Sequence, residues 1–171
     1  MTQSEQSQPL ITLTMTDEQA SAVKAALDLF VRLGIGQLEE VADLVRGGFI
    51  PMANVYGLHS GVRDTASVEV CDAVHEQMLR VKDLLGYQRN GSHGVGHPAN
   101  HICAMRAYEV EKVLSQVIAT HRNPSPAFRG VDYDGLRVRY TSDPAPTASV
   151  SNAAFLVTNS AGMPMDGRDD S

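Results

Sequence analysis

Apolar residues begin to recur at helical spacing near position 16. Thr16 opens the stretch TDEQ, in which its hydroxyl and the Gln19 side chain can reciprocally satisfy two free backbone amides. Such a capping box marks the start of a helix. Apolar residues then follow every three or four positions to about Leu33, so we predict a first helix over residues 16–33.

Two glycines separate this helix from a shorter one. Gly34 and Gly36 break the apolar pattern, which resumes over residues 38–45 and stops at a Gly-Gly pair. Because glycine is common where helices end, the pattern predicts a tight turn between two helices, an αα-hairpin. Gln37 lies in this turn, where its amide can cap or cross-link the helices.

Two longer helices follow. Residues 64–85 carry one continuous apolar stripe that stops before Gly86 and consists of Val70, Val74, Met78, Val81 and Leu85. A fourth helix is predicted over residues 100–121, where Asn123 and Pro124 end it. Its inward candidates are Ile102, Met105, Val113 and Val117.

Two other segments alternate apolar and polar residues at the period of a strand. Residues 10–15 read LITLTM, which predicts a short strand. Residues 127–141 contain an Asp134-Gly135 turn between two extended runs, a strong local signal for a β-hairpin. The second run would place Arg137 and Arg139 together on one face.

The mixture of patterns predicts an α+β fold with about four helices and a small antiparallel sheet. We expect a single domain over residues 10–142, since a chain of 171 residues with 43% hydrophobic content can bury one core. Residues 1–9 are predicted to be flexible. Residues 143–171 are predicted to be a disordered tail, although AAFLV at 153–157 could pair as an extra strand.

Composition bounds the cellular setting. No apolar run approaches the ~18–20 residues that span a bilayer, and the N-terminus lacks the basic and apolar regions of a signal peptide. We therefore expect a cytoplasmic protein without membrane contact.

Cys71 and Cys103 are expected to be buried free thiols, because each falls in a helical pattern beside apolar neighbours.

The net charge of −6 is unevenly distributed. Residues 1–85 hold six Lys or Arg against twelve Asp or Glu, and residues 142–171 hold one against four. Residues 86–141 hold seven against four and form the only part with a positive balance. DNA binding along the whole surface is excluded, because it needs clustered cations. One small anion in one pocket is compatible with this distribution.

A glycine- and histidine-rich connection lies in the positive part. Residues 87–101 read YQRNGSHGVGHPANH. The segment can be a metal site, a cradle of backbone amides for an anion, or an ordinary loop. Histidines four residues apart bind zinc when they share a helical face, but Pro98 and the glycines prevent one continuous helix across His93, His97 and His101.

Catalytic chemistry has few candidates. The chain has no GxSxG elbow, no CxxC and no HExxH. Carboxylates are sparse around the loop, and Glu109 and Glu111 are expected on a solvated helix face. We therefore predict a binding protein with no metal, no cofactor and no catalytic residue.

The anion-cradle interpretation uses the loop and the hairpin together. A glycine-rich loop that enters a helix collects free amides at the positive end of the helix dipole, and its glycines permit the positive φ angles that a concave run of amides needs. Tyr87, Tyr133 or Tyr140 could stack on a base. The predicted ligand-binding residues are Arg89, Asn90, Gly91, Ser92, His93, Gly94, Gly96, Asn100, Arg137 and Arg139.

Three segments carry a resemblance to known proteins. ALDLFVRLGIGQLEEV (26–41), RNGSHGVGHP (89–98) and AYEVEKVLSQVIA (107–119) resemble a widespread group of small phage and prophage proteins. More loosely, the chain looks like the Thoeris anti-defence sponge proteins, which sequester cyclic ADP-ribose-type immune signals, and in some members cyclic oligonucleotides, without degrading them. The resemblance implies a doubly charged cyclic nucleotide as ligand, a pocket near a subunit interface, and a dimer or a multiple of dimers.

The leading functional hypothesis is thus a non-catalytic, oligomeric, phage-type protein that sequesters a nucleotide-derived immune signal and counteracts host antiviral defence. Six of the seven cations in residues 86–141 are arginines, which pair with phosphate in two places. A protein-interaction module that binds a host protein through its helices is the alternative. A histidine-dependent or zinc-dependent hydrolase is the third interpretation.

Overall fold

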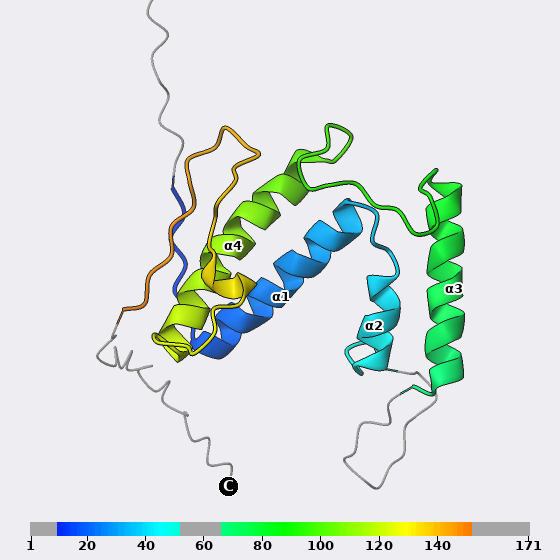
Figure 1. Cartoon of the computed structure of the whole chain (residues 1–171), viewed down its shortest axis with the longest axis horizontal. Helices are drawn as coiled ribbons and strands as arrows, with labels where there is room; N and C mark the ends of the chain where they lie inside the picture. Colours follow the sequence, from blue (N-terminus) through cyan, green and yellow to red (C-terminus); the bar gives the residue numbers. More distant parts are fainter. Residues whose placement is uncertain (1–9, 52–65, 152–171) are drawn as a thin grey trace, which may run out of the picture.

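The computed structural model describes residues 10–51 and 66–151. Four α-helices and one 3-10 turn follow one another: α1 (Asp17–Gly34), α2 (Glu40–Arg46), α3 (Val68–Leu84), α4 (Ile102–Arg122) and η1 (Val131–Tyr133) (Figure 1). The four predicted helices are confirmed. The flexible N-terminus predicted for residues 1–9 and the extra strand predicted at 153–157 lie outside the described residues.

The predicted α+β fold is wrong, because the described residues form helices and no strand. Residues 10–15, the predicted N-terminal strand, belong to neither a helix nor a sheet, and Ile11 is 95% exposed. Alternation of apolar and polar residues predicts a strand only where a neighbouring strand accepts the backbone hydrogen bonds. Residues 10–15 have no such neighbour within the part of the chain that the structure describes.

The predicted β-hairpin over residues 127–141 is wrong for a specific reason. The turn exists, with Gly135 at φ +65°, but the arm before it contains the 3-10 turn η1, which packs on α4. In the other arm, the amides of Tyr140 and Thr141 donate to the Glu109 carboxylate of α4, over 2.7 and 2.8 Å. Amides that bind a side chain cannot also form a strand ladder.

α1 begins as its capping box predicts. The Gln19 amide donates to the Thr16 hydroxyl over 3.2 Å, and the Thr16 amide donates to the Gln19 side chain over 2.9 Å. The helix runs for 18 residues and ends at Gly34.

α1 and α4 lie side by side and run in opposite directions (Figure 1). Arg122 at the end of α4 binds Asp17 at the start of α1 over 2.5 Å. At the other end, a Cβ added to Gly34 would lie 2.8 Å from Ala104 Cβ, so the two backbones meet closely there. The buried apolar residues of these helices and of the turn after α1 are Val31, Ile35, Ala104, Ala107, Leu114 and Ile118.

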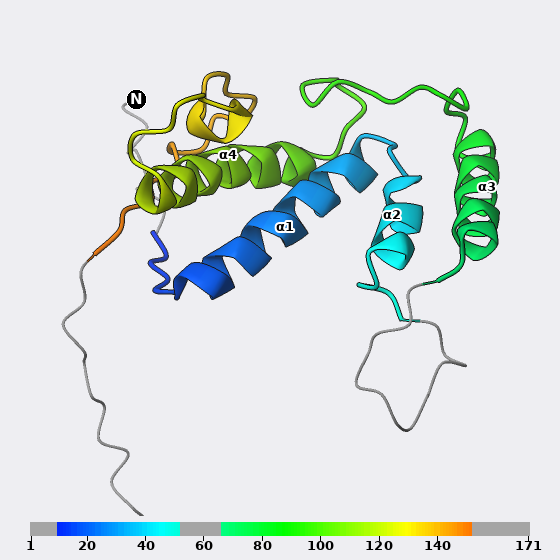
Figure 2. The same cartoon turned by 60° about the horizontal axis from the view of Figure 1, so that its bottom comes forward.

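α2 and α3 form a second, thinner pair. α2 has seven residues, and α3 packs on no other helix within the described residues. Figure 2 shows α3 on the outer side of α2, away from α1 and α4. The fully buried Lys82 of α3 binds Glu39 at the start of α2, with Nζ 2.9 Å from Oε2. The buried apolar residues of this pair are Ala42, Val45, Cys71 and Leu79.

The buried side of α3 differs from the predicted one. We call the predicted apolar residues Val70, Val74, Met78, Val81 and Leu85 the α3 strip. None of them is buried: Leu85 is 63% exposed and Val81 is 36% exposed. The residues buried toward α2 are instead Cys71, Leu79 and Lys82.

The structure also bears on the predictions about the cysteines and about the membrane. Both cysteines are free, but only Cys71 is buried, and Cys103 is exposed, contrary to the prediction. None of the helices described here is long and apolar enough to cross a membrane.

Candidate functional site

The glycine loop, residues 87–101, is anchored to the turn between α1 and α2. The His93 amide donates to the Ile35 carbonyl over 2.8 Å, and the Gln37 side chain donates to the Ser92 hydroxyl over 3.4 Å. The Tyr87 ring lies against Gly36, where an added Cβ would overlap it. The loop therefore joins the α2–α3 pair to the α1–α4 pair (Figure 2).

Asn100 organises the loop from inside. Its side chain is buried, donates from Nδ2 to the carbonyls of Gly94 and Val95 over 2.8 Å each, and lies 3.1 Å from His93 Nδ1 through Oδ1. Because Oδ1 can only accept, His93 Nδ1 carries the proton in this contact. Asn100 thus holds the loop in shape and does not face a ligand.

The loop glycines do not adopt the predicted conformation. Positive φ angles occur at four glycines of the described residues, and Gly91, Gly94 and Gly96 are not among them. The Gly91 amide donates to the Gln88 carbonyl over 2.9 Å, and Gly96 lies against the Tyr140 ring, so both have structural roles. The predicted concave run of amides with positive φ is therefore wrong.

Eight amides of the loop have no acceptor within the described residues, and four of these lie between Ser92 and Gly96: those of Ser92, Gly94, Val95 and Gly96. In a trans peptide the N–H points away from the preceding carbonyl. Since Asn100 draws in the carbonyls of Gly94 and Val95, the next two amides point away from it. Of the predicted anion cradle, the structure therefore contains only these two outward-pointing amides, those of Val95 and Gly96.

The predicted anion-binding arginines are engaged elsewhere. Arg89 binds Glu76 of α3 over 2.5 Å, and Arg137 binds Asp134 over 2.5 Å. Arg139 donates to the Thr141 and Asp143 carbonyls and lies 3.7 Å from Glu109. Asn90 is exposed, and the structure assigns it no side-chain hydrogen bond within the described residues. The structure does not bring the arginines together around the loop amides.

Internal carboxylates neutralise most of the positive charge. Of the twelve Lys and Arg residues that the structure describes, all but Arg80 and Arg129 lie within 4.0 Å of a carboxylate. The positive balance of residues 86–141 therefore arises because its acidic partners, such as Asp17, Glu76 and Asp143, lie outside that segment in the sequence.

Glu109 of α4 is a buried carboxylate with several hydrogen-bond partners. It is 2% exposed and accepts hydrogen bonds from the Tyr140 amide, the Thr141 amide and the Thr141 hydroxyl. Burial raises the pKa of its carboxyl, but these hydrogen bonds and Arg139 outweigh burial and lower the pKa below the ordinary 4.5. The carboxylate fixes residues 139–143 on α4.

The prediction that Glu109 and Glu111 form a solvated face is wrong, because Glu111 is also only 4% exposed. Glu111 accepts a hydrogen bond from Ser115 over 2.5 Å and lies 3.0 Å from Lys112 Nζ. A signal was present in the sequence: Glu109 lies four residues from both Met105 and Val113 on the predicted inward stripe.

The three tyrosines that could stack on a base have protein partners. Tyr87 contacts the His93 ring at a centroid distance of 4.9 Å, and Tyr140 contacts Tyr108 at 5.6 Å. The Tyr133 hydroxyl donates to the Asn123 carbonyl over 3.0 Å.

Two histidines of the glycine loop, His97 and His101, accept hydrogen bonds from backbone amides. The Ala99 amide donates to His97 Nδ1 and the Cys103 amide donates to His101 Nδ1, each over 3.2 Å. The second bond caps the start of α4. His93 and His97 stack at 3.9 Å. Among residues 10–51 and 66–151, no group of three His, Cys, Asp or Glu is placed to hold a metal ion.

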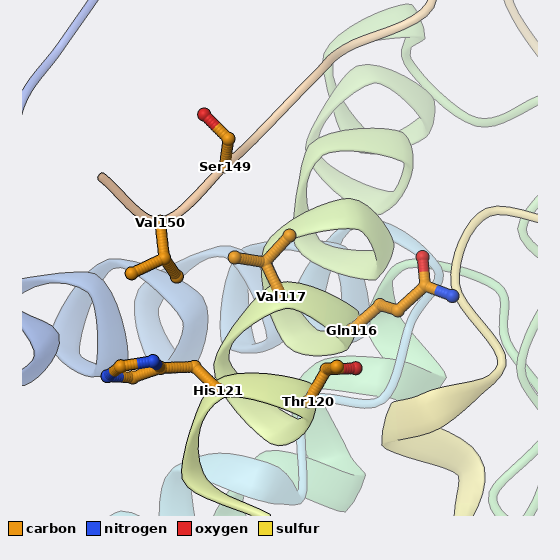
Figure 3. Close-up of a pocket in the computed structure, with 6 residues that line it drawn as sticks. All are labelled: Gln116, Val117, Thr120, His121, Ser149 and Val150. Atoms are coloured by element: carbon orange, nitrogen blue, oxygen red, sulfur yellow. The ribbon is translucent and has the colours of Figure 1, made fainter. Parts of the chain in front are cut away.

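The larger pocket lies away from the glycine loop. It has a volume of about 460 Å³ between α4 and residues 149–150, and Figure 3 shows the side chains that line it. They are Gln116, Val117, Thr120, His121, Ser149 and Val150. None of the predicted ligand-binding residues lies there, and no Lys, Arg, Asp or Glu lines it.

A smaller pocket of about 210 Å³ lies where α1, α4 and Val95 of the glycine loop meet. Its lining contains two cations and two anions, and these pair with one another. Arg32 binds Asp28 over 2.7 Å, and Lys112 binds Glu111 over 3.0 Å. The pocket therefore has little net charge with which to attract a phosphate.

Comparison of the chain with protein-family models, with curated proteins and with solved structures finds no significant match. The resemblance to phage anti-defence proteins stays a prediction. The geometry of the described residues is the basis for the functional proposals below.

Proposed function

We propose that this chain is a protein-interaction module that acts by binding another protein chain and does not catalyse a reaction. The observation that carries the proposal is a contrast between polar and apolar groups. No buried side-chain nitrogen or oxygen of the described residues lacks a hydrogen-bond partner, whereas large apolar side chains are exposed on several helices.

Among the described helices, the most exposed large apolar side chains lie on α3. Leu84 is 86% exposed and Leu85, which caps the helix, is 63% exposed. α3 packs on one face against the seven-residue α2 and on no other described helix. An exposed apolar surface of this kind is characteristic of a protein–protein interface, so α3 is the face that we assign to the partner.

Site-specific photo-cross-linking in cells that contain the chain tests this proposal. A photoreactive phenylalanine analogue at Leu84 should give a covalent adduct with another protein chain. The same analogue at Asp72, which is exposed and lies ~120° around α3 from Leu84, is the matched control and should give none. Equal adducts at both positions, or none at either, would contradict an interface on α3.

Sequestration of a nucleotide-derived immune signal is the second candidate, and one observation favours it. The amides of Val95 and Gly96 point away from Asn100 and have no acceptor within the described residues, and such amides can bind a phosphate oxygen. Arg137 and Arg139 would have to leave their present carboxylate and carbonyl partners to join this site.

Thermal-shift measurements against cyclic ADP-ribose isomers and cyclic di- and trinucleotides test the second candidate. A rise in the melting temperature that the double variant Arg137→Ala, Arg139→Ala abolishes would support sequestration. Release of unchanged nucleotide from denatured protein would separate sequestration from hydrolysis. No shift with any of these nucleotides would leave the interaction module as the only candidate.

A further inference from the structure

The α3 strip is an apolar surface that is partly open: Val81 and Leu85 are exposed, whereas Val70, Val74 and Met78 are partly buried. With ~100° per residue, the centre of the strip lies about a quarter turn from Cys71, Leu79 and Lys82, which are buried toward α2. Leu85 in the strip is 63% exposed, and Leu84 beside it is 86% exposed. α3 therefore has two adjacent apolar sides: α2 covers one, and the other is partly exposed, most of all at its C-terminal end.

No carboxylate of α3 itself borders the α3 strip. The same helical geometry places the acidic residues of α3 on the far side of the helix, and these are Glu69, Asp72, Glu76 and Asp83. The residues that border the strip on its open side are the uncharged Ala73 and Gln77. A second copy of α3 can therefore approach the strip without bringing like charges together.

Side-chain size changes along the strip. At the N-terminal end the side chains are small, with Val70 in the strip and Ala73 beside it. At the C-terminal end they are larger, with Leu85 in the strip and Leu84 beside it. Two antiparallel copies set the large side chains of one against the small side chains of the other. Two parallel copies crowd the leucines at one end and leave the other end underfilled, which close packing disfavours.

We propose that the α3 strip binds the α3 strip of a second copy of this chain, with the two helices antiparallel around Gln77 and Met78. Leu85 of one copy then lies over Val70 of the other, and the contact extends ~22 Å along the helices. The two Gln77 amides meet near the symmetry axis, where each can donate to the other. This inference rests on the proposed function and identifies the partner chain.

The expected dimer is weak. One pair of helices buries less surface than the ~1,600 Å² of a standard interface. We therefore expect dissociation in the micromolar range, with monomer and dimer in rapid exchange.

Sedimentation velocity of the full chain over a concentration series tests the self-association. The sedimentation coefficient should rise with concentration. The double variant Leu84→Glu, Leu85→Glu should weaken association roughly a hundredfold, because it places charges in an apolar contact. Both side chains are exposed in the single chain, so the variant should fold, and its circular dichroism spectrum checks this. Asp72→Lys, on the far side of α3, is the control and should associate like the wild type.

Disulfide cross-linking tests the orientation. Cys103→Ser first removes the exposed native thiol. In that background, a mixture of the Val70→Cys and Leu85→Cys chains should form a mixed disulfide, and Leu85→Cys alone should not cross-link to itself. Rapid self-cross-linking of Leu85→Cys would establish parallel helices and overturn the proposed orientation.

The outcomes separate this inference from the function on which it rests. A chain that stays monomeric at concentrations approaching millimolar, or glutamate variants that associate like the wild type, would overturn the self-association. If the photoreactive group at Leu84 then captures a different protein, the interaction module stands and its partner is not a second copy. If the adduct has twice the mass of the chain, both proposals are supported.

Discussion

The α1–α4 pair and the α2–α3 pair are both built from amphipathic helices. Only in the first pair are the two helices of similar length, so that each covers the other. α1 and α4 have 18 and 21 residues, so each covers the other along most of its length. α3 has 17 residues and α2 has seven. A helix can bury only the side that a partner covers, and for this reason the α3 strip stays partly exposed.

The two pairs also differ in how they hold buried charge. In the first pair, the Glu109 carboxylate on α4 is satisfied by three hydrogen bonds from residues 140–141. In the second pair, Glu39 is the one hydrogen-bond partner of Lys82 Nζ among the described residues. A buried charge with one partner depends strongly on that partner, so the second pair should be the more sensitive to single substitutions.

The largest effect is expected at the junction between the two pairs. Gly36→Ala should destabilise the protein by about 2–4 kcal/mol, because Gly36 has φ +93° and an added Cβ would overlap Tyr87. Urea unfolding measures the loss. Gly94→Ala is the matched control, since Gly94 has open space around it and no positive φ. Equal stability of the two variants would mean that the Tyr87 contact does not join the pairs.

Glu39→Ala should be next in size and confined to the second pair. Removing Glu39 leaves Lys82 fully buried without a counter-ion, and we expect a loss of about 2–3 kcal/mol, less than for a completely buried pair because Glu39 is partly exposed. Lys82→Met should cost less, since it removes the charge and keeps an apolar side chain. Hydrogen exchange should increase in α3 first. Equal increases in α1 and α4 would show that the two pairs unfold together.

The same ion pair predicts a dependence on pH. Burial raises the pKa of Glu39, but the hydrogen bond from Lys82, a backbone hydrogen bond and the charge of Lys82 together outweigh burial and bring the pKa below 4.5. A lowered folded-state pKa contributes stability above the unfolded value of ~4.3, and this stability is lost as the pH falls through the folded-state pKa. The Glu39→Gln variant should lack this part of the acid dependence in unfolding measured from pH 6 to pH 3.

In the first pair, Glu109→Gln should cost about 1–2 kcal/mol, since it weakens the hydrogen bonds to Tyr140 and Thr141. The lowered pKa of Glu109 means that the wild type should hold these two amides above pH ~4.3 and release them at lower pH. Hydrogen exchange of Tyr140 and Thr141 measures the release. Fast exchange of both amides in the wild type at pH 6 would contradict the Glu109 contact.

The smallest effect is expected at the surface. Arg137→Ala should change stability by no more than about 0.5 kcal/mol, because its ion pair with Asp134 is exposed and only three residues away in sequence. Urea unfolding beside the wild type checks this. A loss above 1 kcal/mol would reveal a role for Arg137 that the single chain does not show.

The sequence predicted the candidate site only in part. The glycine loop does lie before α4, and Ser92, His93 and Asn100 do come together in it. The predicted arginines do not join them, because Arg89 and Arg137 bind the carboxylates of Glu76 and Asp134, and Arg139 binds the Asp143 carbonyl. The acidic partners of Arg89 and Arg106 lie 13 and 37 residues away in the chain, and no local pattern records such pairings.

The sequence by itself determined where α1 begins and ends. The capping box at Thr16 and the glycine at the end of α1 act through neighbours within a few residues, so a local pattern contains the whole interaction. Only the tertiary structure decided which side of α3 is buried. It also decided that the Tyr140 and Thr141 amides, in a predicted strand, donate to Glu109. Those outcomes depend on contacts between α3 and α2, and between α4 and residues 140–141, which lie about thirty residues or more apart in the chain. Burial and hydrogen-bond partners at that separation are set by packing and not by spacing.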